Sequence, residues 1–239
     1  MTLDALVFGS HPDDVELASG GLAALLAAHG HAVGVCDLTR GERASRGTPA
    51  ERAAEAAEAA RRLGVAERFS AGLPDLGLDR RDPAQLRAVV AILRARRPRL
   101  VVAPDDDDAH PDHVEASHLV RRACYLAGLA RFDAPGERHR PERLLFALYR
   151  TVRPPHLVVD VTPVWERRQA ALAAHVSQLD PARGPATYLT HPDFASEVEA
   201  RGRWFGALVG VRYGEGYRTR GPVAVADARA LLGGAGGAA

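Results

Sequence analysis

The sequence predicts an α/β fold in which a mostly parallel sheet carries helices on both faces. Two observations support this prediction. Apolar runs of strand length alternate with longer segments of helical periodicity along most of the chain. Crossovers of this kind join parallel strands. With 239 residues, 46% of them hydrophobic, the chain can form one large domain, which we expect over residues 1–232, followed by a flexible Gly-rich tail over 233–239.

The predicted strands are short apolar runs without strict alternation, as is typical of strands buried on both faces of a parallel sheet. They cover residues 3–9, 32–38, 68–71, 100–104, 144–149 and 157–161. Polar, glycine-containing residues at 39–47 predict a loop.

The predicted helices are bounded by recognisable start and stop residues. Thr48-Pro49-Ala50-Glu51 combines a capping box with proline at the first helical position, and Gly64 ends that helix. The other predicted helices cover residues 15–29, 83–96, 114–126, 164–176 and 194–209.

Composition argues against several classes of protein. The formal net charge is +1, so overall charge gives no reason to expect binding to nucleic acid or to a membrane. No apolar stretch is long enough to span a bilayer, and we expect a cytoplasmic protein. Cys36 and Cys124 lie in separate apolar runs, which predicts buried free thiols. No G-x-G-x-x-G motif follows the first strand, so a dinucleotide cofactor is not expected.

Two histidine-aspartate clusters stand at strand-to-helix turns. His11-Pro12-Asp13-Asp14 follows the first predicted strand, and His110-Pro111-Asp112-His113 follows the fourth. In an open α/β sheet, ligands bind at the carboxyl ends of the strands. Either cluster alone could simply be a helix N-cap with a proline in the first turn. Two clusters that can meet at one edge of the sheet indicate a single metal site.

The spacing within the clusters suggests the metal ligands. His11 and Asp14 are three residues apart and can share one face of a first helical turn. His113 is the best candidate for a third ligand. Such a His₂Asp set suits Zn²⁺, or another divalent metal, and leaves a coordination position open, as in catalytic sites.

The remaining cluster residues are candidates for proton transfer and support. Asp13 is not needed as a ligand and could act as a general base. His110 could stabilise an oxyanion or protonate a leaving amine. Asp112 could orient either histidine of its cluster.

The HPDD and HPDH clusters resemble those of the PIG-L or LmbE-like family of zinc-dependent N-acetylglucosaminyl deacetylases. The resemblance covers most of the chain, and segments 36–39, 72–75, 103–104, 209–211 and 214–216 are similar to the bacillithiol-pathway branch, which removes acetate from N-acetylglucosaminyl-malate. It implies a Rossmann-like fold, a zinc cofactor, an anionic amino-sugar substrate and a homo-oligomer, often a hexamer. Ala109 and Phe194 depart from the family pattern, because relatives often carry Arg and some carry Tyr there.

The same resemblance implies roles for the site residues. It implies zinc ligands at His11, Asp14 and His113, a base at Asp13, and an electrostatic partner at His110. It also implies that Arg52 contacts the substrate.

Arg52 has a second argument in its favour. It lies in the first turn of the helix that follows Thr48, where a cation opposes the helix dipole. An anionic substrate would explain this placement, because arginine can grip a carboxylate with two hydrogen bonds. The alternative is a surface ion pair with Glu42, Glu51 or Glu55.

Other functions stay open at this stage. The chain could be a family amidase acting on another amino sugar or a thiol conjugate, or a metal- or sugar-binding module without catalysis. It could also be a two-metal phosphoesterase that uses the acidic run Asp105 to Asp108, although such a run is more often a solvated loop.

Overall fold

The computed structural model describes residues 1–151 and 153–224, and the tail expected over 233–239 lies outside them. Within these residues one sheet has the strand order β3-β2-β1-β4-β5-β7-β6. Its strands are β1 (Ala5–Gly9), β2 (Val33–Asp37), β3 (Glu67–Ser70), β4 (Leu100–Pro104), β5 (Arg143–Ala147), β6 (Leu157–Asp160) and β7 (Gly214–Arg218). Strands β1 to β5 pair in parallel, which confirms the predicted sheet, and β7 runs antiparallel to both of its neighbours.

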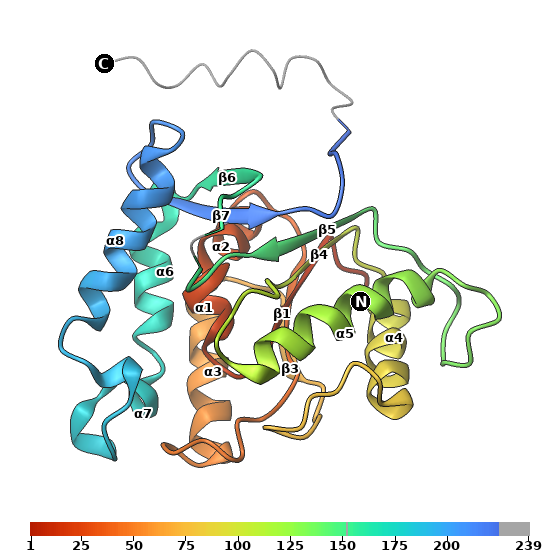
Figure 1. The fold of residues 1–239 in the computed structure, drawn as a ribbon, viewed down its shortest axis with the longest axis horizontal. Coiled ribbons are helices and arrows are strands. Elements are labelled where there is room, and N and C mark those ends of the chain that lie inside the picture. The colour runs from red at the N-terminus through yellow and green to blue at the C-terminus, as the bar shows by residue number, and fades with distance from the viewer. Residues whose placement is uncertain (152, 225–239) are drawn as a thin grey trace.

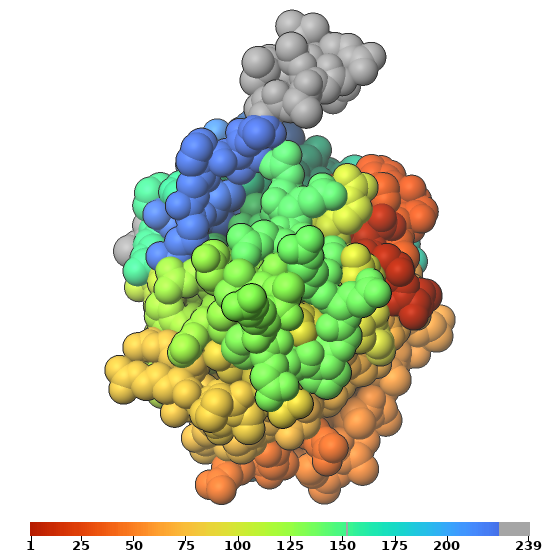
Figure 2. All heavy atoms as spheres, turned by 90° about the vertical axis from the view of Figure 1, so that its right-hand side faces the viewer, coloured from red at the N-terminus to blue at the C-terminus, as the bar shows by residue number. Residues whose placement is uncertain are grey.

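Helices cover both faces of this sheet, as predicted (Figure 1). They are α1 (Asp14–Ala18), α2 (Gly20–Ala28), α3 (Pro49–Leu63), α4 (Pro83–Arg96), α5 (Pro111–Ala127), α6 (Trp165–Leu172), α7 (Val176–Leu179) and α8 (Phe194–Ala207). Alternate residues of β1 divide between two cores. Leu6 and Phe8 pack on the side of α4 and α5, and Ala5 and Val7 pack on the side of α1 and α2. Figure 2 shows the face on which α5 and the green segment after it cover the middle of the surface.

The strand order explains why the two clusters meet. The chain steps outward from β1 to β2 and β3, then returns to place β4 on the other side of β1. This reversal is a topological switch point, where the loops at the carboxyl ends of adjacent strands diverge and leave a crevice. HPDD follows β1 and HPDH follows β4, so both clusters lie at this crevice.

The helix predicted over residues 15–29 is divided in two at Ser19. The backbone angles φ and ψ of Ser19 are −145° and 9°, which lie outside the helical range. The reason lies near the other end of the chain. The carboxylate of Glu215 accepts hydrogen bonds from the backbone N–H groups of Gly21 at 2.7 Å and Leu22 at 2.8 Å, and so caps a new helix start. Local periodicity cannot reveal a cap supplied from 194 residues away.

Strand β7 was not predicted, because Gly214 and Gly216 interrupt its apolar pattern. Both glycines are required by packing. A Cβ on Gly216 would lie 2.3 Å from the ring of Phe205 in α8, and one on Gly214 would lie 2.6 Å from Val158. The strand therefore carries glycine where a helix presses against the sheet.

Other boundaries differ by smaller amounts. The helix predicted over 164–176 ends at Leu172 and is followed by the short α7, and α5 begins at Pro111, so the HPDH cluster lies within its first turn. The Thr48 capping box is present, Gly64 ends α3 in the left-handed conformation, and Cys36 and Cys124 are buried and free, all as predicted. Among the described residues, no helix is both long enough and apolar enough to cross a membrane.

Candidate functional site

The fold brings three predicted metal ligands together. His11 follows β1, Asp14 opens α1, and His113 lies in the first turn of α5. One potential ligand atom from each lies within 4.8 Å of the others. The Asp14 carboxylate lies between the two rings, 3.4 Å from Nδ1 of His11 and 3.3 Å from Nε2 of His113.

The outer nitrogen of His11 is fixed by two carboxylates. Its Nε2 lies 3.2 Å from Asp75 and 3.3 Å from Asp112, so the predicted orienting function of Asp112 would act on His11. Burial by itself lowers the pKa of His11, but the hydrogen bonds to Asp112, Asp14 and Asp75 outweigh it and raise that pKa to about 12. Asp75 was missed in the sequence, because it lies in a loop whose path periodicity does not predict.

His113 is held in the same way. Its Nδ1 lies 3.0 Å from a carboxylate oxygen of Asp108. Burial lowers the pKa of His113, and the nearby Asp14 and Asp108 reverse the effect and raise it to about 10. Metal-binding histidines usually donate their second ring N–H to a carboxylate, which fixes the ring and its tautomer. The donor set fits a zinc-type ion, because it offers two imidazole nitrogens and one carboxylate oxygen. The outer nitrogen of each imidazole is held by a carboxylate.

Three carboxylates of the acidic run before HPDH pair with arginine, so the run is not the solvated loop expected from the sequence. Arg153 pairs with Asp105, Asp106 and Asp107, and Arg220 pairs with Asp106. The fourth carboxylate, Asp108, belongs to His113 as described above. The run is therefore an ion-paired anchor for the loop, and it does not offer four free carboxylates to a second cation.

Asp13 has a strained backbone. Its φ of 118° is in a region that non-glycine residues rarely occupy, and such strain typically costs about 1–3 kcal/mol. The residue is 5% exposed. Burial raises the pKa of its carboxyl group, while the adjacent Arg52 acts in the opposite direction. A buried carboxyl group with a raised pKa, next to the metal ligands, suits a proton acceptor.

Arg52 lies in the wall of the pocket, as the sequence-based assignment to the substrate requires, and it contacts the turn at Asp13. It is 3% exposed, and its Nη2 donates to the carbonyl oxygen of Pro12 at 2.5 Å and to Asp13 Oδ1 at 3.3 Å. The predicted surface pair with a glutamate is wrong, because Glu51 and Glu55 bond elsewhere, to Thr48 and Ser177. The Nη2 atom of Arg52 is bonded to the strained turn at Asp13. Contact between Arg52 and the substrate stays a prediction.

His110 is the N-cap of α5. Its Nδ1 accepts a hydrogen bond from the backbone N–H of Asp112 at 3.2 Å, so the neutral ring carries its proton on Nε2. Burial and the positive charges of His11 and His113 lower the pKa of His110. A neutral ring with a free N–H can donate to an oxyanion. His110 also forms a second possible metal group with His11 and Asp112.

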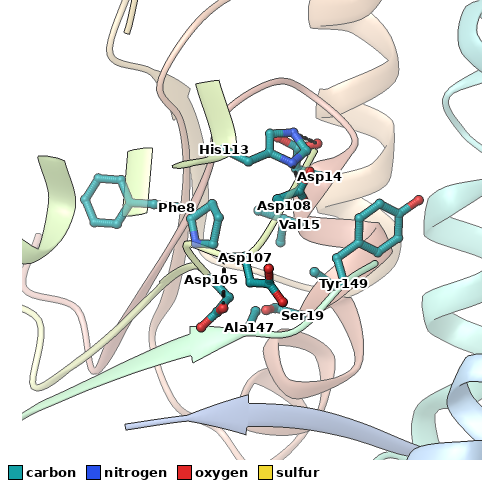
Figure 3. A pocket seen from close by; sticks show the side chains of 12 residues that line it. Phe8, Asp14, Val15, Ser19, Asp105, Asp107, Asp108, His113, Ala147 and Tyr149 are labelled. Atoms are coloured by element: carbon teal, nitrogen blue, oxygen red, sulfur yellow. Dashed lines mark hydrogen bonds and ion pairs between the residues drawn. The ribbon is translucent and has the colours of Figure 1, made fainter. Parts of the chain in front are cut away.

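A pocket of about 530 Å³ opens above these residues. It is lined by His11, Asp13, Asp14, Arg52, His110 and His113, and also by Arg43, Asp75, Ala109, Tyr149, Arg150 and Tyr188. Phe194 is buried against Tyr188 and does not belong to this lining. Figure 3 shows a smaller neighbouring cavity, with Asp14 and His113 on one side and Tyr149 on another.

Comparisons with known proteins show what the chain is similar to. The family model described as GlcNAc-PI de-N-acetylase, PIG-L, matches residues 6–124. A crystal structure of the conserved protein TT1542 from Thermus thermophilus is 39% identical, with a TM-score of 0.86 over 94% of this chain and 97% of that one. A 1D-myo-inositol 2-acetamido-2-deoxy-alpha-D-glucopyranoside deacetylase of Rhodococcus opacus is 26% identical over 81% of this chain and 87% of its own length. Diacetylchitobiose deacetylase of Thermococcus kodakarensis is 28% identical over 87% of this chain and 79% of its own length.

Proposed function

Because the chain belongs to the GlcNAc-PI de-N-acetylase (PIG-L) family, we propose that it hydrolyses the acetamide of an N-acetylglucosaminide with the help of a divalent metal ion. One observation carries this proposal. Two histidines and a carboxylate face one another at the switch point of the sheet, and carboxylates hold the outer nitrogens of both rings. This arrangement lies in a pocket that also contains a buried carboxyl group and a neutral histidine.

His11, Asp14 and His113 would hold the metal, with zinc as the leading candidate and another divalent ion as the alternative. When bound, such an ion polarises a carbonyl group and makes water a better nucleophile. Two ring nitrogens and one carboxylate leave room for water and substrate, as in catalytic rather than structural zinc sites.

Asp13 would act as the proton acceptor, and His110 would act as a hydrogen-bond or proton donor. Asp13, with a raised pKa beside the ligands, accepts a proton from the attacking water. His110 presents its Nε2–H to the oxygen that gains negative charge, or to the leaving nitrogen. Hydrolysis of the amide then yields acetate and the free amine of the sugar.

We propose an anionic group on the far side of the sugar, with the malate glycoside of the bacillithiol pathway as leading candidate. Arg43 and Arg150 line the pocket, and neither guanidinium has a carboxylate partner among the residues that the structure describes. Arg150 is stacked on Tyr188, with its Cζ 3.8 Å from the ring centroid. Two uncommitted guanidinium groups favour a carboxylate over a neutral aglycone. The inositol glycoside named for the Rhodococcus relative is the principal alternative.

A free-amine release assay tests both levels of the proposal. The zinc-loaded protein would be offered N-acetylglucosaminyl-malate, N-acetylglucosaminyl-inositol, diacetylchitobiose and N-acetylglucosamine. We expect turnover that a chelator abolishes and added metal restores, with the highest kcat/KM on the malate glycoside. Arg43→Gln and Arg150→Gln should reduce the preference for malate while leaving neutral substrates almost unaffected. Equal kcat/KM on the inositol and malate glycosides would contradict the anionic assignment, and no release from any substrate would contradict the deacetylase.

The same assay separates the other candidates. A metal- or sugar-binding module without catalysis would bind N-acetylglucosamine and release no amine. A two-metal phosphoesterase would need about two metal ions per chain, and the ion pairs of Asp105, Asp106 and Asp107 speak against a second ion there.

A further inference from the structure

Tyr149 carries a hydroxyl group that the protein leaves unused. The residue follows β5 by two positions and lines both the large pocket and the small cavity of Figure 3. Its Oη atom is shielded from solvent and has no hydrogen-bond partner among the described residues. An unpaired buried hydroxyl group typically costs about 1–3 kcal/mol. Such a cost is tolerated where a ligand supplies the missing partner.

The ring is held in place from behind. Arg201 of α8 stacks on it, with its Cζ 4.4 Å from the ring centroid. The backbone is fixed as well, because the N–H of the preceding Leu148 donates to Gly216 of β7 at 3.0 Å. In Figure 3 the ring points away from Asp107 and Ser19.

The hydroxyl group can act only as a neutral partner. Burial raises the pKa of Tyr149, so the phenol stays protonated at neutral pH. The positive charge of Arg201 against the ring makes its O–H a better donor. Tyr188, the other tyrosine of the pocket wall, differs in this respect, because its hydroxyl already donates to Glu197 at 2.6 Å.

We infer that the Tyr149 hydroxyl donates a hydrogen bond to a hydroxyl oxygen of the amino sugar, and that Tyr149 thereby determines specificity for the sugar ring. This inference rests on the proposed function. Tyr149 comes from the segment after β5, whereas Asp13 and His110 come from the turns after β1 and before α5. All three residues line one pocket. Because Asp13 and His110 are assigned to the acetamide, the Tyr149 hydroxyl is left for the rest of the sugar.

Tyr149→Phe tests the inference by removing one oxygen atom. In the zinc-loaded enzyme we expect KM for the best substrate to rise about tenfold, the equivalent of about 1.4 kcal/mol, with little change in kcat. The urea midpoint should stay the same or rise, because the variant loses an unpaired buried polar atom. A merely structural hydroxyl would instead lower the midpoint and leave KM unchanged. Tyr125→Phe is the matched control, because Tyr125 is 60% exposed on α5 and lies outside the pocket lining.

Substrate analogues identify the bonded oxygen. The 3-, 4- and 6-deoxy forms of the substrate would each be measured with both proteins. We expect one analogue to lose affinity in the wild type and to lose nothing further in Tyr149→Phe. Fully additive losses for all three analogues, or an unchanged KM in the variant, would overturn the inference.

A calorimetric titration with N-acetylglucosamine separates this inference from the proposed function. If the zinc-loaded wild type binds the sugar more tightly than Tyr149→Phe but releases no amine, the deacetylase proposal fails and the inference on Tyr149 stands. Equal dissociation constants for the two proteins, or no binding by either, would overturn the inference whatever the activity.

Discussion

At the scale of single residues, a substitution of Asp13 tests whether catalysis can be lost while metal binding is kept. Asp13→Asn keeps the shape of the side chain and, like aspartate, tolerates the left-handed backbone of this position. Because it cannot accept the proton, kcat should fall about 10²- to 10⁴-fold. The metal content, measured by emission spectroscopy, should stay that of the wild type. Normal turnover by the metal-loaded variant would exclude Asp13 as the base.

The contact between Arg52 and Asp13 leads to a prediction that differs from the sequence-based one. Since Arg52 bonds to Pro12 and Asp13, Arg52→Ala should release the strained turn and reduce kcat on charged and neutral substrates alike. Loss of a charged hydrogen bond is worth about 1.5–3 kcal/mol. Arg52→Lys should recover only part of the lost kcat, because an ammonium group lacks the planar, fixed donor geometry of a guanidinium group. If steady-state assays show a loss confined to the malate glycoside, the sequence-based assignment of Arg52 to the substrate is the better one.

The histidine pKa values predict how metal binding depends on pH. In protein stripped of metal by a chelator, His11 and His113 have pKa values raised to about 12 and about 10, so both are protonated at pH 7. A metal must displace these protons. Zinc binding should therefore release about two protons, and the apparent affinity should increase with pH. Titration calorimetry in buffers of different ionisation enthalpy measures this release; zero release would contradict the ligand assignment.

The residues that were predictable share one property. His11, Asp14 and His113 could be found because their types and spacing recur at two strand ends. Asp75 and Asp108 could not be assigned, because a loop and an acidic run have no periodicity that fixes their path. Tyr149 gave no signal at all, since the role of a tyrosine depends on whether its hydroxyl finds a partner. The helix position of Arg52 drew attention to it, but its contacts with Pro12 and Asp13 could not be predicted, because they join residues about forty positions apart.

At the scale of elements, the junction of α1 and α2 depends on Glu215. Glu215→Ala would leave the N–H groups of Gly21 and Leu22 unpaired in the core, and the free energy of unfolding should fall by about 1–3 kcal/mol. Urea denaturation followed by circular dichroism measures the change. Glu137→Ala, at an exposed loop position, serves as the control and should stay within about 0.5 kcal/mol of the wild type. Equal midpoints for the two variants would argue against the cap.

Elements were predictable where local signals decide them. Strand β4 and helix α4 lie at their predicted bounds, because apolar runs, a proline and an N-capping residue are all local. The break at Ser19 and strand β7 were missed, because each depends on a partner distant in sequence. The antiparallel edge of the sheet was missed for the same reason, because β7 pairs with strands that are distant in sequence.

At the scale of the whole molecule, a buried charge network joins several layers. Glu16 of α1 bonds to Arg68 at 2.6 Å and to His175 at 3.2 Å, and Arg68 also bonds to Asp37 of β2 at 2.8 Å. Burial by itself would raise the pKa of Glu16, but Arg68 and His175 outweigh it and lower that pKa to about 2. These ion pairs hold α1, and with it Asp13 and Asp14, against the sheet.

This network predicts acid sensitivity with a definite sign. Because the pKa of Glu16 is lower in the folded state, its stabilisation is complete above about pH 4.5 and is lost as the pH falls toward 2. This stabilisation contributes up to about 3 kcal/mol to the free energy of unfolding. The Glu16→Gln variant should have a lower free energy of unfolding than the wild type at pH 7. Its free energy of unfolding should fall less than that of the wild type on acidification. Urea melts from pH 7 to pH 3 test this; parallel curves for the two proteins would contradict it.

The reach of Glu215 back to Gly21 also bears on the order in which the protein is completed during synthesis. The ribosome adds nearly two hundred residues after Gly21 before the glutamate that caps α2 exists. Until then the helix pair that begins with Asp14, one of the three proposed metal ligands, lacks the group that sets its bend. Domains commonly begin to fold while the chain is still growing. Here strand β7, the last one in the described part of the chain, is required to fix the geometry of the first helices, so a nascent chain arrested before Gly214 should bind zinc more weakly than the finished protein.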